Sequence, residues 1–270
     1  MIYTGRNQNL KIEAYELCPC DSGEKYKFCC YKKTKSDDDL KRKTMLSYPD
    51  KRLGHVTSSF WGKSDFKTCY GFDLDKCNGK IIGAHSIQNN RILNRLSEDS
   101  HVYSIDTHVS FKQVRPEFKR ISRNDASTFF GFCKHHDTEI FKPIELKEYK
   151  NEPLQNFLFA FRALTIEVHK KRRQLTTIKN LFKEFPSLMA SNECVYVYRI
   201  SQLDDKHYQY YHTIFKTIYE CEGFRDITTI NYQLNYETSF ATSTAFSVQF
   251  DLKGKEINDK SDIHSNVALI

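Results

Sequence analysis

The clearest pattern of hydrophobic positions lies in the second half of the chain. Between Pro153 and Pro186, apolar side chains recur at steps of three and four residues. This spacing predicts one long helix with a buried face, because proline is favoured at the first helical position and cannot continue a helix later. The same spacing around residues 211–218 predicts a second helix that ends before Gly223.

The last part of the chain follows a different period. Apolar and polar residues alternate over 230–236 and again over 246–252, and "VALI" closes the sequence. A period of two is typical of strands with one covered face. We therefore expect residues 151–270 to form an α+β domain in which a helix packs on a mostly antiparallel sheet.

The first half of the chain has shorter apolar segments. Residues 33–52, "KTKSDDDLKRKTMLSYPDKR", are rich in charge and predict a linker or an exposed helix, so we place a domain boundary near residue 45. The three expected sections are therefore 1–45, 46–150 and 151–270.

The composition indicates a folded protein that stays in a reducing compartment. Hydrophobic residues make up 39% of the chain and aromatic residues 14%, which is enough for packed cores. The N-terminus has no secretory signal pattern, and the most apolar run, "FLFAFRALTI", spans about ten residues where a membrane span needs roughly 20. We expect a cytoplasmic protein without a membrane span. Its net charge of +7 permits nucleic-acid binding without requiring it.

Four of the nine cysteines lie close together near the N-terminus, as Cys18, Cys20, Cys29 and Cys30. An odd total and a reducing compartment argue against complete disulfide pairing, and adjacent cysteines make a strained bridge. The spacing C-x-C-x8-C-C brings two thiolate pairs together once the chain turns back. Four thiolates with no open position describe a structural zinc site.

This stretch, "CPCDSGEKYKFCC", resembles the SEC-C motif, a short zinc-binding module found in many bacterial proteins. It departs from the usual motif at Asp21 and at Tyr31, and neither change removes a thiol. The resemblance implies a small zinc knuckle. The lysines around it suit an acidic partner, lipid headgroups or nucleic-acid phosphates, and a solvated tether would have the same composition.

A second set of candidate metal ligands lies between residues 69 and 137. Cys133 and His136, three positions apart, suit one face of the first turn of a helix. The partner pair is either Cys69 with Cys77 or Cys77 with His85. Two such half-sites, distant in sequence, are typical of a treble-clef-like zinc domain.

The segments "CNGKIIGAHSIQ" and "FFGFCKHHD" are similar to the HNH, or ββα-metal, endonucleases. The resemblance implies that Cys69, Cys77, Cys133 and His136 bind a structural zinc ion. It also implies that His85 is a general base and that Asp137 is a ligand of a catalytic divalent metal such as Mg²⁺ or Mn²⁺. The chain departs from the pattern at Thr128, where the family has an asparagine, and in a longer gap between His85 and Cys133.

Basic and aromatic residues lie between the two half-sites, and either a nucleic-acid surface or a solvated charged face would have them. The seven cations are Arg91, Arg95, Lys112, Arg115, Lys119, Arg120 and Arg123, interleaved with Tyr103, Phe111 and Phe118.

The sequence predicts a nucleic-acid-binding protein with about two zinc ions, acting as a metal-dependent nuclease, and the resemblances imply a bacterial protein with a role in host defence. The alternative is a non-enzymatic adaptor in which both zinc ions are structural and the knuckle docks a protein partner.

Overall fold

The computed structural model describes residues 11–34, 50–109, 114–259, 262, 264 and 266–270. It contains both long helices and small antiparallel sheets, so the α+β class expected from the sequence is confirmed. No helix in the described part of the chain has the length and hydrophobicity needed to cross a lipid bilayer.

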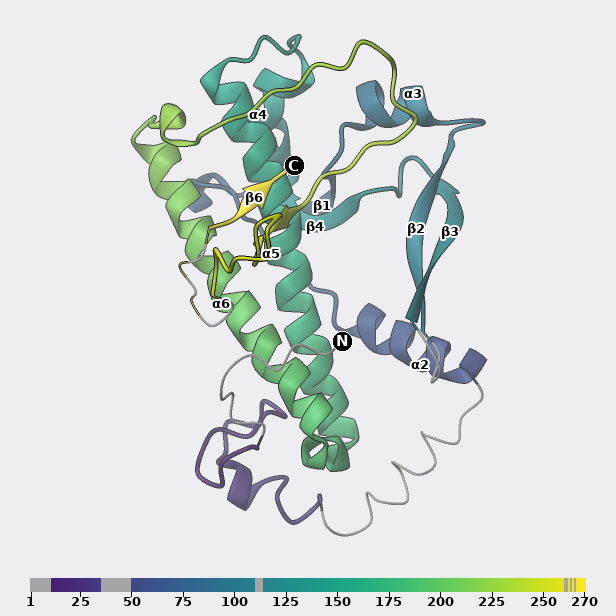
Figure 1. The fold of residues 1–270 in the computed structure, drawn as a ribbon, viewed down its shortest axis with the longest axis vertical. Coiled ribbons are helices and arrows are strands. Elements are labelled where there is room, and N and C mark those ends of the chain that lie inside the picture. The colour runs from purple at the N-terminus through teal and green to yellow at the C-terminus, as the bar shows by residue number, and fades with distance from the viewer. Residues whose placement is uncertain (1–10, 35–49, 110–113, 260–261, 263, 265) are drawn as a thin grey trace. The chain divides into compact units, whose positions relative to one another are not determined.

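Two long helices provide the main scaffold of the fold (Figure 1). Helix α5 runs over Pro153–Glu184 and helix α6 over Asn192–Glu220, with the 3-10 turn η4 (Pro186–Ala190) between them. The prediction of a helix from Pro153 that stops before Pro186 is confirmed. Helix α6 ends before Gly223 as predicted, but it starts well before residue 211. The sequence does not reveal this start, because the first half of the helix carries many polar residues that hide the apolar spacing.

A strand pair and a helix form the framework of the central region. Strands β1 (Ile81–His85) and β4 (Thr128–Cys133) are antiparallel, with Ile81 opposite Cys133 and His85 opposite Thr128. Helix α4 (Lys134–Glu145) follows β4 directly. Strands β2 (His101–Val109) and β3 (Val114–Ser122) form a separate two-stranded sheet inserted between β1 and β4.

Shorter elements connect these parts. They are η1 (Tyr26–Phe28), α2 (Asp50–Lys63), η2 (Leu74–Lys76), the π-helical turn η3 (Asn89–Leu93), α3 (Asn94–Leu96) and η5 (Phe224–Asp226).

The C-terminal segment forms less sheet than its alternating pattern predicts. Strands β5 (Ala245–Phe246) and β6 (Ala268–Leu269) pair, so the strand predicted at the chain's end is confirmed. The strand predicted over 230–236 is wrong, and that predicted over 246–252 is reduced to Phe246 and an isolated bridge from Phe250 to Glu256. Ile230 and Tyr232 keep 90% and 86% of their surface exposed. An alternating pattern makes a strand only where a second strand or a covering face is present.

The chain divides into two compact units that interleave along the sequence. One unit comprises residues 1–65, 106–117 and 171–205, and the other comprises 66–105, 118–170 and 206–270. Helices α5 and α6 each contribute residues to both units.

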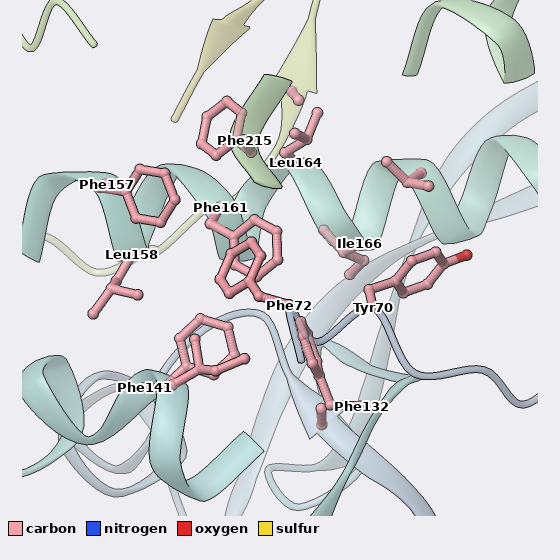
Figure 2. Packing of buried hydrophobic residues seen from close by; sticks show 14 of the residues in the cluster. Tyr70, Phe72, Phe132, Phe141, Phe157, Leu158, Phe161, Leu164, Ile166 and Phe215 are labelled. Atoms are coloured by element: carbon pink, nitrogen blue, oxygen red, sulfur yellow. The ribbon is translucent and has the colours of Figure 1, made fainter. Parts of the chain in front are cut away.

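Aromatic side chains fill the core of the second unit (Figure 2). Phe161 of α5 stacks on Phe72 with ring centroids 4.4 Å apart, and Phe132 of β4 meets Phe141 of α4 edge-on at 5.1 Å. Phe132, Phe141 and Phe161 are fully buried. Each buried ring contributes about 1.5–3 kcal/mol from transfer out of water. This core fixes β4 and α4 against α5, which determines where the ends of β1 and α4 lie.

Candidate metal centres and an adjoining pocket

The N-terminal cysteines come together because the chain turns back on itself between them. Cys18 N–H donates to the carbonyl of Glu24, and Tyr26 N–H donates to the carbonyl of Glu16. Asp21 and Gly23 adopt positive φ in the intervening loop. Gly tolerates this left-handed conformation without steric cost, and Asp tolerates it better than most residues. The turn therefore places Cys18 and Cys20 beside the pair that follows η1.

The four sulfur atoms have the spacing of a tetrahedral metal site. All lie within 4.8 Å of one another, with Cys20 Sγ 3.5 Å from Cys29 Sγ and Cys29 Sγ 3.7 Å from Cys30 Sγ. Zinc–sulfur bonds near 2.3 Å in a tetrahedron separate the sulfurs by about 3.8 Å. The cluster can therefore hold a zinc ion with four thiolates.

Ionisation of all four thiols is costly in this cluster, and a bound cation would remove that cost. Burial raises the pKa of Cys18 to about 11 and raises that of Cys30 further above its usual value, with the neighbouring thiols adding to the effect on Cys30. For Cys20, burial acts to raise the pKa, but hydrogen bonds from Ser22 and contacts with Cys18 and Cys29 outweigh it and lower the pKa to about 7. Four thiolates in one buried cluster repel one another, and a divalent cation removes that cost.

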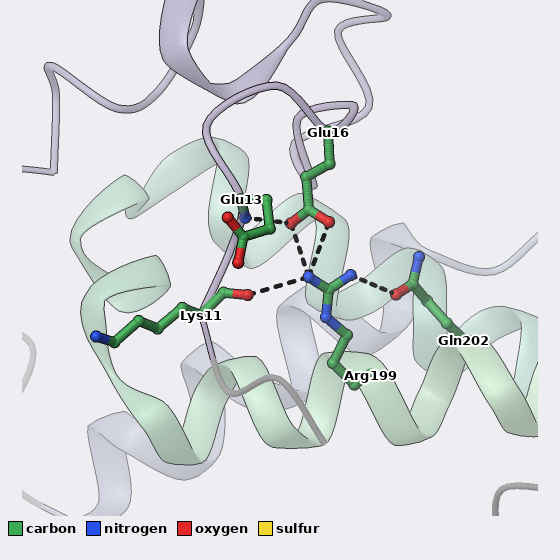
Figure 3. Close-up of polar contacts among 5 residues, drawn as sticks. All are labelled: Lys11, Glu13, Glu16, Arg199 and Gln202. Carbon is green, nitrogen blue, oxygen red and sulfur yellow. Dashed lines mark hydrogen bonds and ion pairs between the residues drawn. The ribbon is translucent and has the colours of Figure 1, made fainter. Parts of the chain in front are cut away.

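The knuckle packs on the α5 and α6 segments of its own unit. Its thiols share a buried cluster with Phe182, Met189 and Tyr198. Figure 3 shows Arg199 of α6 donating from Nη2 to both carboxylate oxygens of Glu16, at 2.7 and 2.8 Å. A second ion pair joins Lys179 Nζ to Asp21 Oδ1 at 2.8 Å. The knuckle is therefore part of this unit's core.

The central cluster joins residues that precede β1 to residues at the junction of β4 and α4. Residues 68–70 run along β4, because Thr68 N–H donates to Phe130 and Tyr70 N–H donates to Gly131. This places Cys69 next to Cys133, the last residue of β4 and the N-cap of α4. Cys77 follows η2 and lies shortly before β1.

Cys69, Cys77, Cys133 and His136 offer ligand atoms that all lie within 4.8 Å of one another. His136 Nδ1 is 3.2 Å from both Cys69 Sγ and Cys133 Sγ. Of the two ligand pairs left open by the sequence, the structure brings Cys69 with Cys77 to the cluster and leaves His85 outside it. Three thiols and one imidazole are a donor set that zinc accepts in closed tetrahedral sites.

Cys69 and Cys133 of this cluster also have shifted pKa values. Burial raises the pKa of Cys69 to about 11. Burial acts in the same direction on Cys133, but backbone N–H groups of His136 and Asn78 and the neighbouring thiols outweigh it, so the pKa falls to about 6. The lowered pKa of Cys133 and its place at the positive end of α4 both favour the thiolate form that a metal ion would bind.

Gly71 leaves the space that the ring of His136 occupies. A Cβ atom on Gly71 would lie 2.5 Å from Cγ and 2.6 Å from Nδ1 of His136. Gly71 lies between the buried residues Tyr70 and Phe72, so its backbone cannot move away freely. The absence of a side chain at this position is therefore a condition for the four-ligand arrangement.

His85 and Asp137 line one pocket of about 560 Å³ next to the central cluster. His85 is the last residue of β1, and Asp137 lies in the first turn of α4. Burial lowers the pKa of His85 and raises that of Asp137, and the positive charge of Arg162 acts to lower both. The remaining lining residues are Asn89, Asn90, Thr138, Lys142, Glu145, Leu146 and Arg162.

Three buried polar atoms without a hydrogen-bond partner among the described residues belong to residues that line this pocket. They are His85 Nε2, Asn89 Oδ1 and Arg162 Nε. Buried polar groups are nearly always paired, so three such atoms around one pocket indicate a site for a polar ligand. The sequence analysis missed Asn89 and Arg162, although a charge inside the apolar run "FLFAFRALTI" was a signal for a buried, paired group.

The described basic residues between the half-sites differ in exposure, because Arg91 and Arg123 are half-buried and the others are exposed. All six residues from Arg115 to Arg120 are exposed, and Tyr103 and Phe118 on β2 and β3 keep 69% and 74% of their surface accessible. Lys112 and Phe111 lie outside the described residues.

Comparison of the chain with known protein families, with curated proteins and with solved structures finds no match in any of the three.

Proposed function

We propose that the protein is a metal-dependent nuclease of the HNH type, with two structural zinc sites that maintain its fold. The observation that carries this proposal is the separation of two sets of residues on one framework. Four ligands gather in the central cluster, while His85 and Asp137 line an adjoining open pocket. A histidine that served only as a structural ligand would lie within the cluster.

The framework also corresponds to the order of elements that the resemblance implies. An antiparallel strand pair precedes a helix, the histidine stands at the end of the first strand, and the carboxylate stands on the first turn of the helix. The insertion of β2 and β3 between the strands accounts for the long gap between His85 and Cys133.

The pocket can accommodate a catalytic ion only with help from substrate or water. Among the described residues, the groups of three or more His, Cys, Asp or Glu ligands within 4.8 Å are the two cysteine-rich clusters. Asp137 would therefore be the main protein ligand for Mg²⁺ or Mn²⁺, ions that commonly use one or two carboxylates together with phosphate oxygens and water. A bound ion there would stabilise negative charge on the phosphate.

The reaction assigned to the chain's own residues is hydrolysis of a phosphodiester. His85 Nε2 takes a proton from a water molecule as the water oxygen forms a bond to phosphorus. The bond between phosphorus and the leaving oxygen breaks, and that oxygen takes a proton from solvent. Among the described residues His85 Nε2 has no hydrogen-bond partner, so no protein donor competes with water for this atom.

Substitution of His85 by alanine tests the proposal. With Mg²⁺ or Mn²⁺ present, cleavage of plasmid DNA or single-stranded RNA should fall by a factor of about 10² or more, the usual contribution of a general base. The zinc content should stay unchanged, because His85 lies outside the cluster. His55→Ala, on the exposed face of α2, is the matched control. Loss of zinc from His85→Ala, or equal cleavage by the variant, would contradict the assignment.

The adaptor function has one observation in its favour. Tyr15, Leu17 and Phe28 on the knuckle keep 60%, 70% and 69% of their surface exposed, and Lys27 Nζ lies 5.0 Å from the Tyr15 ring centre. An exposed aromatic surface with cations suits a protein partner. A purified protein that neither cleaves nucleic acid nor binds it at low salt would favour this alternative.

A further inference from the structure

The pocket beside the central cluster contains a buried cation that the proposed reaction does not use. Arg162 comes from helix α5 and reaches the pocket from outside the β1–β4–α4 framework. It is 3% exposed, although it carries a full charge. A charge so deeply buried requires compensation from its surroundings.

The contacts of Arg162 use only part of its hydrogen-bonding capacity. Its Nη1 donates to Glu145 Oε1 at 2.6 Å, and its guanidinium lies 4.1 Å from the ring centre of Phe141. Its Nε has no partner among the described residues. A guanidinium presents five N–H donors in a planar fork that matches the oxygens of a phosphate.

Arg162 lines the same pocket as His85 and Asp137, the two residues of the proposed reaction, so its charge acts where the reacting groups lie. Glu145 places a negative charge in the same pocket, because its one-third-exposed carboxylate also lines it. The carboxylate both holds the guanidinium and competes with any anion that enters.

We propose that Arg162 binds a non-bridging oxygen of a nucleic-acid backbone phosphate in this pocket. The inference builds on the proposed function and names the ligand of its site. Glu145 positions the guanidinium against Phe141 and weakens anion binding by competing for its donors. The site therefore takes a phosphodiester, which presents several oxygens and a single negative charge.

The opposed roles of the two residues give a test in which two substitutions act in opposite directions. The probe is a dinucleoside monophosphate, compared with its uncharged methylphosphonate analogue, bound to the His85→Ala protein without added divalent ion. The phosphate form should bind at least about tenfold more tightly than the analogue, as expected for a charge-assisted hydrogen bond. Arg162→Gln should remove this preference, and Glu145→Gln should increase it by at least severalfold.

Controls separate binding from folding. Lys206→Gln removes an exposed cation that does not line the pocket and should leave the preference unchanged. Arg162→Lys keeps the buried charge but loses the fork, so it should fold with both zinc ions and lose most of the preference. Circular dichroism and zinc content establish that each variant is folded. A folded Arg162→Lys protein that discriminates as before overturns the proposal, as does a Glu145→Gln protein that binds the phosphate form more weakly.

The outcome for the proposed function is read separately, from cleavage by the unsubstituted protein. Cleavage together with unchanged discrimination in the Arg162 and Glu145 variants would refute the phosphate site and leave the nuclease assignment in place. Discrimination that depends on Arg162, in a protein that cleaves no nucleic acid, would support the phosphate site and refute the nuclease assignment.

Discussion

Replacing Gly71 by alanine should disrupt the central metal cluster without touching any of its ligands. The added Cβ atom would lie 2.5, 2.6 and 2.8 Å from Cγ, Nδ1 and Cδ2 of the His136 ring. Carbon atoms in contact are about 3.5–4.0 Å apart, so the ring must retreat by about 1 Å. His136 is 4% exposed, so its ring can retreat only by displacing other buried groups.

The size of the effect follows from the tolerance of a metal site. Zinc ligands hold their distances within about 0.2 Å, so a shift of about 1 Å removes Nδ1 from ligation. Changes that disturb only the orientation of a ligand already cost about 10–100-fold in affinity, and we expect a loss of at least about 100-fold for Gly71→Ala. Steric strain should further lower the free energy of unfolding by about 1–3 kcal/mol.

Competition with a chromophoric chelator measures the affinity of each zinc site, and thermal unfolding with and without zinc measures the linked stability. Gly83→Ala is the matched control on strand β1, because its Cβ would meet Thr128 of the neighbouring strand at an ordinary 3.8 Å. That variant should keep both zinc ions. A Gly71→Ala protein that binds two zinc ions with unchanged affinity would show that His136 is not a ligand in this arrangement.

Three further predictions concern other parts of the chain. Elemental analysis should find about two zinc ions per chain, and the Cys30→Ser variant should contain one fewer. A Cys30→Ser protein that keeps both zinc ions would contradict the knuckle site. Arg199→Ala should lower the free energy of unfolding, measured by chemical denaturation, by about 1 kcal/mol, because the ion pair of Arg199 with Glu16 is partly shielded from water. Lys216→Ala removes a more exposed ion pair and should change the free energy of unfolding little. Affinity for nucleic acid should fall steeply with salt and should weaken about fivefold or more in Phe118→Ala; salt-insensitive binding would refute a phosphate-backbone interface.

Local pattern was sufficient to predict helix α5 and the end of helix α6, and insufficient for the start of α6 and for the C-terminal sheet. Apolar residues spaced by three and four from Pro153 predict a helix with a buried face, whatever that face packs against. Helix α5 begins at that residue. The alternation over 230–236 requires a partner strand that the described part of the chain does not supply, and Tyr232 is left 86% exposed. Strand pairing depends on distant residues, which a local pattern does not contain.

The candidate metal sites were predictable to different degrees for a similar reason. Cys18 and Cys30 are brought together by one short turn, so spacing alone indicates their cluster. The central cluster joins residues more than sixty positions apart. The sequence left two possible ligand pairs, and they are distinguished by the segment that contains Cys69, which lies alongside β4 in the structure. Arg162 reaches its pocket through the packing of α5, which no spacing rule describes.

Helix α4 links the central cluster to the pocket. Successive residues of an α-helix point about 100° apart, so His136 and Asp137 necessarily face different sides. His136 lies in the four-ligand cluster and Asp137 lines the pocket. Because Cys133 caps the helix and His136 packs against Gly71, the rotation of α4 about its axis is set at its first turn. A structural metal bound there would hold Asp137 at the pocket without taking part in any reaction, and the same constraint explains why an ion-binding cluster and a candidate catalytic carboxylate occupy adjacent positions in the sequence.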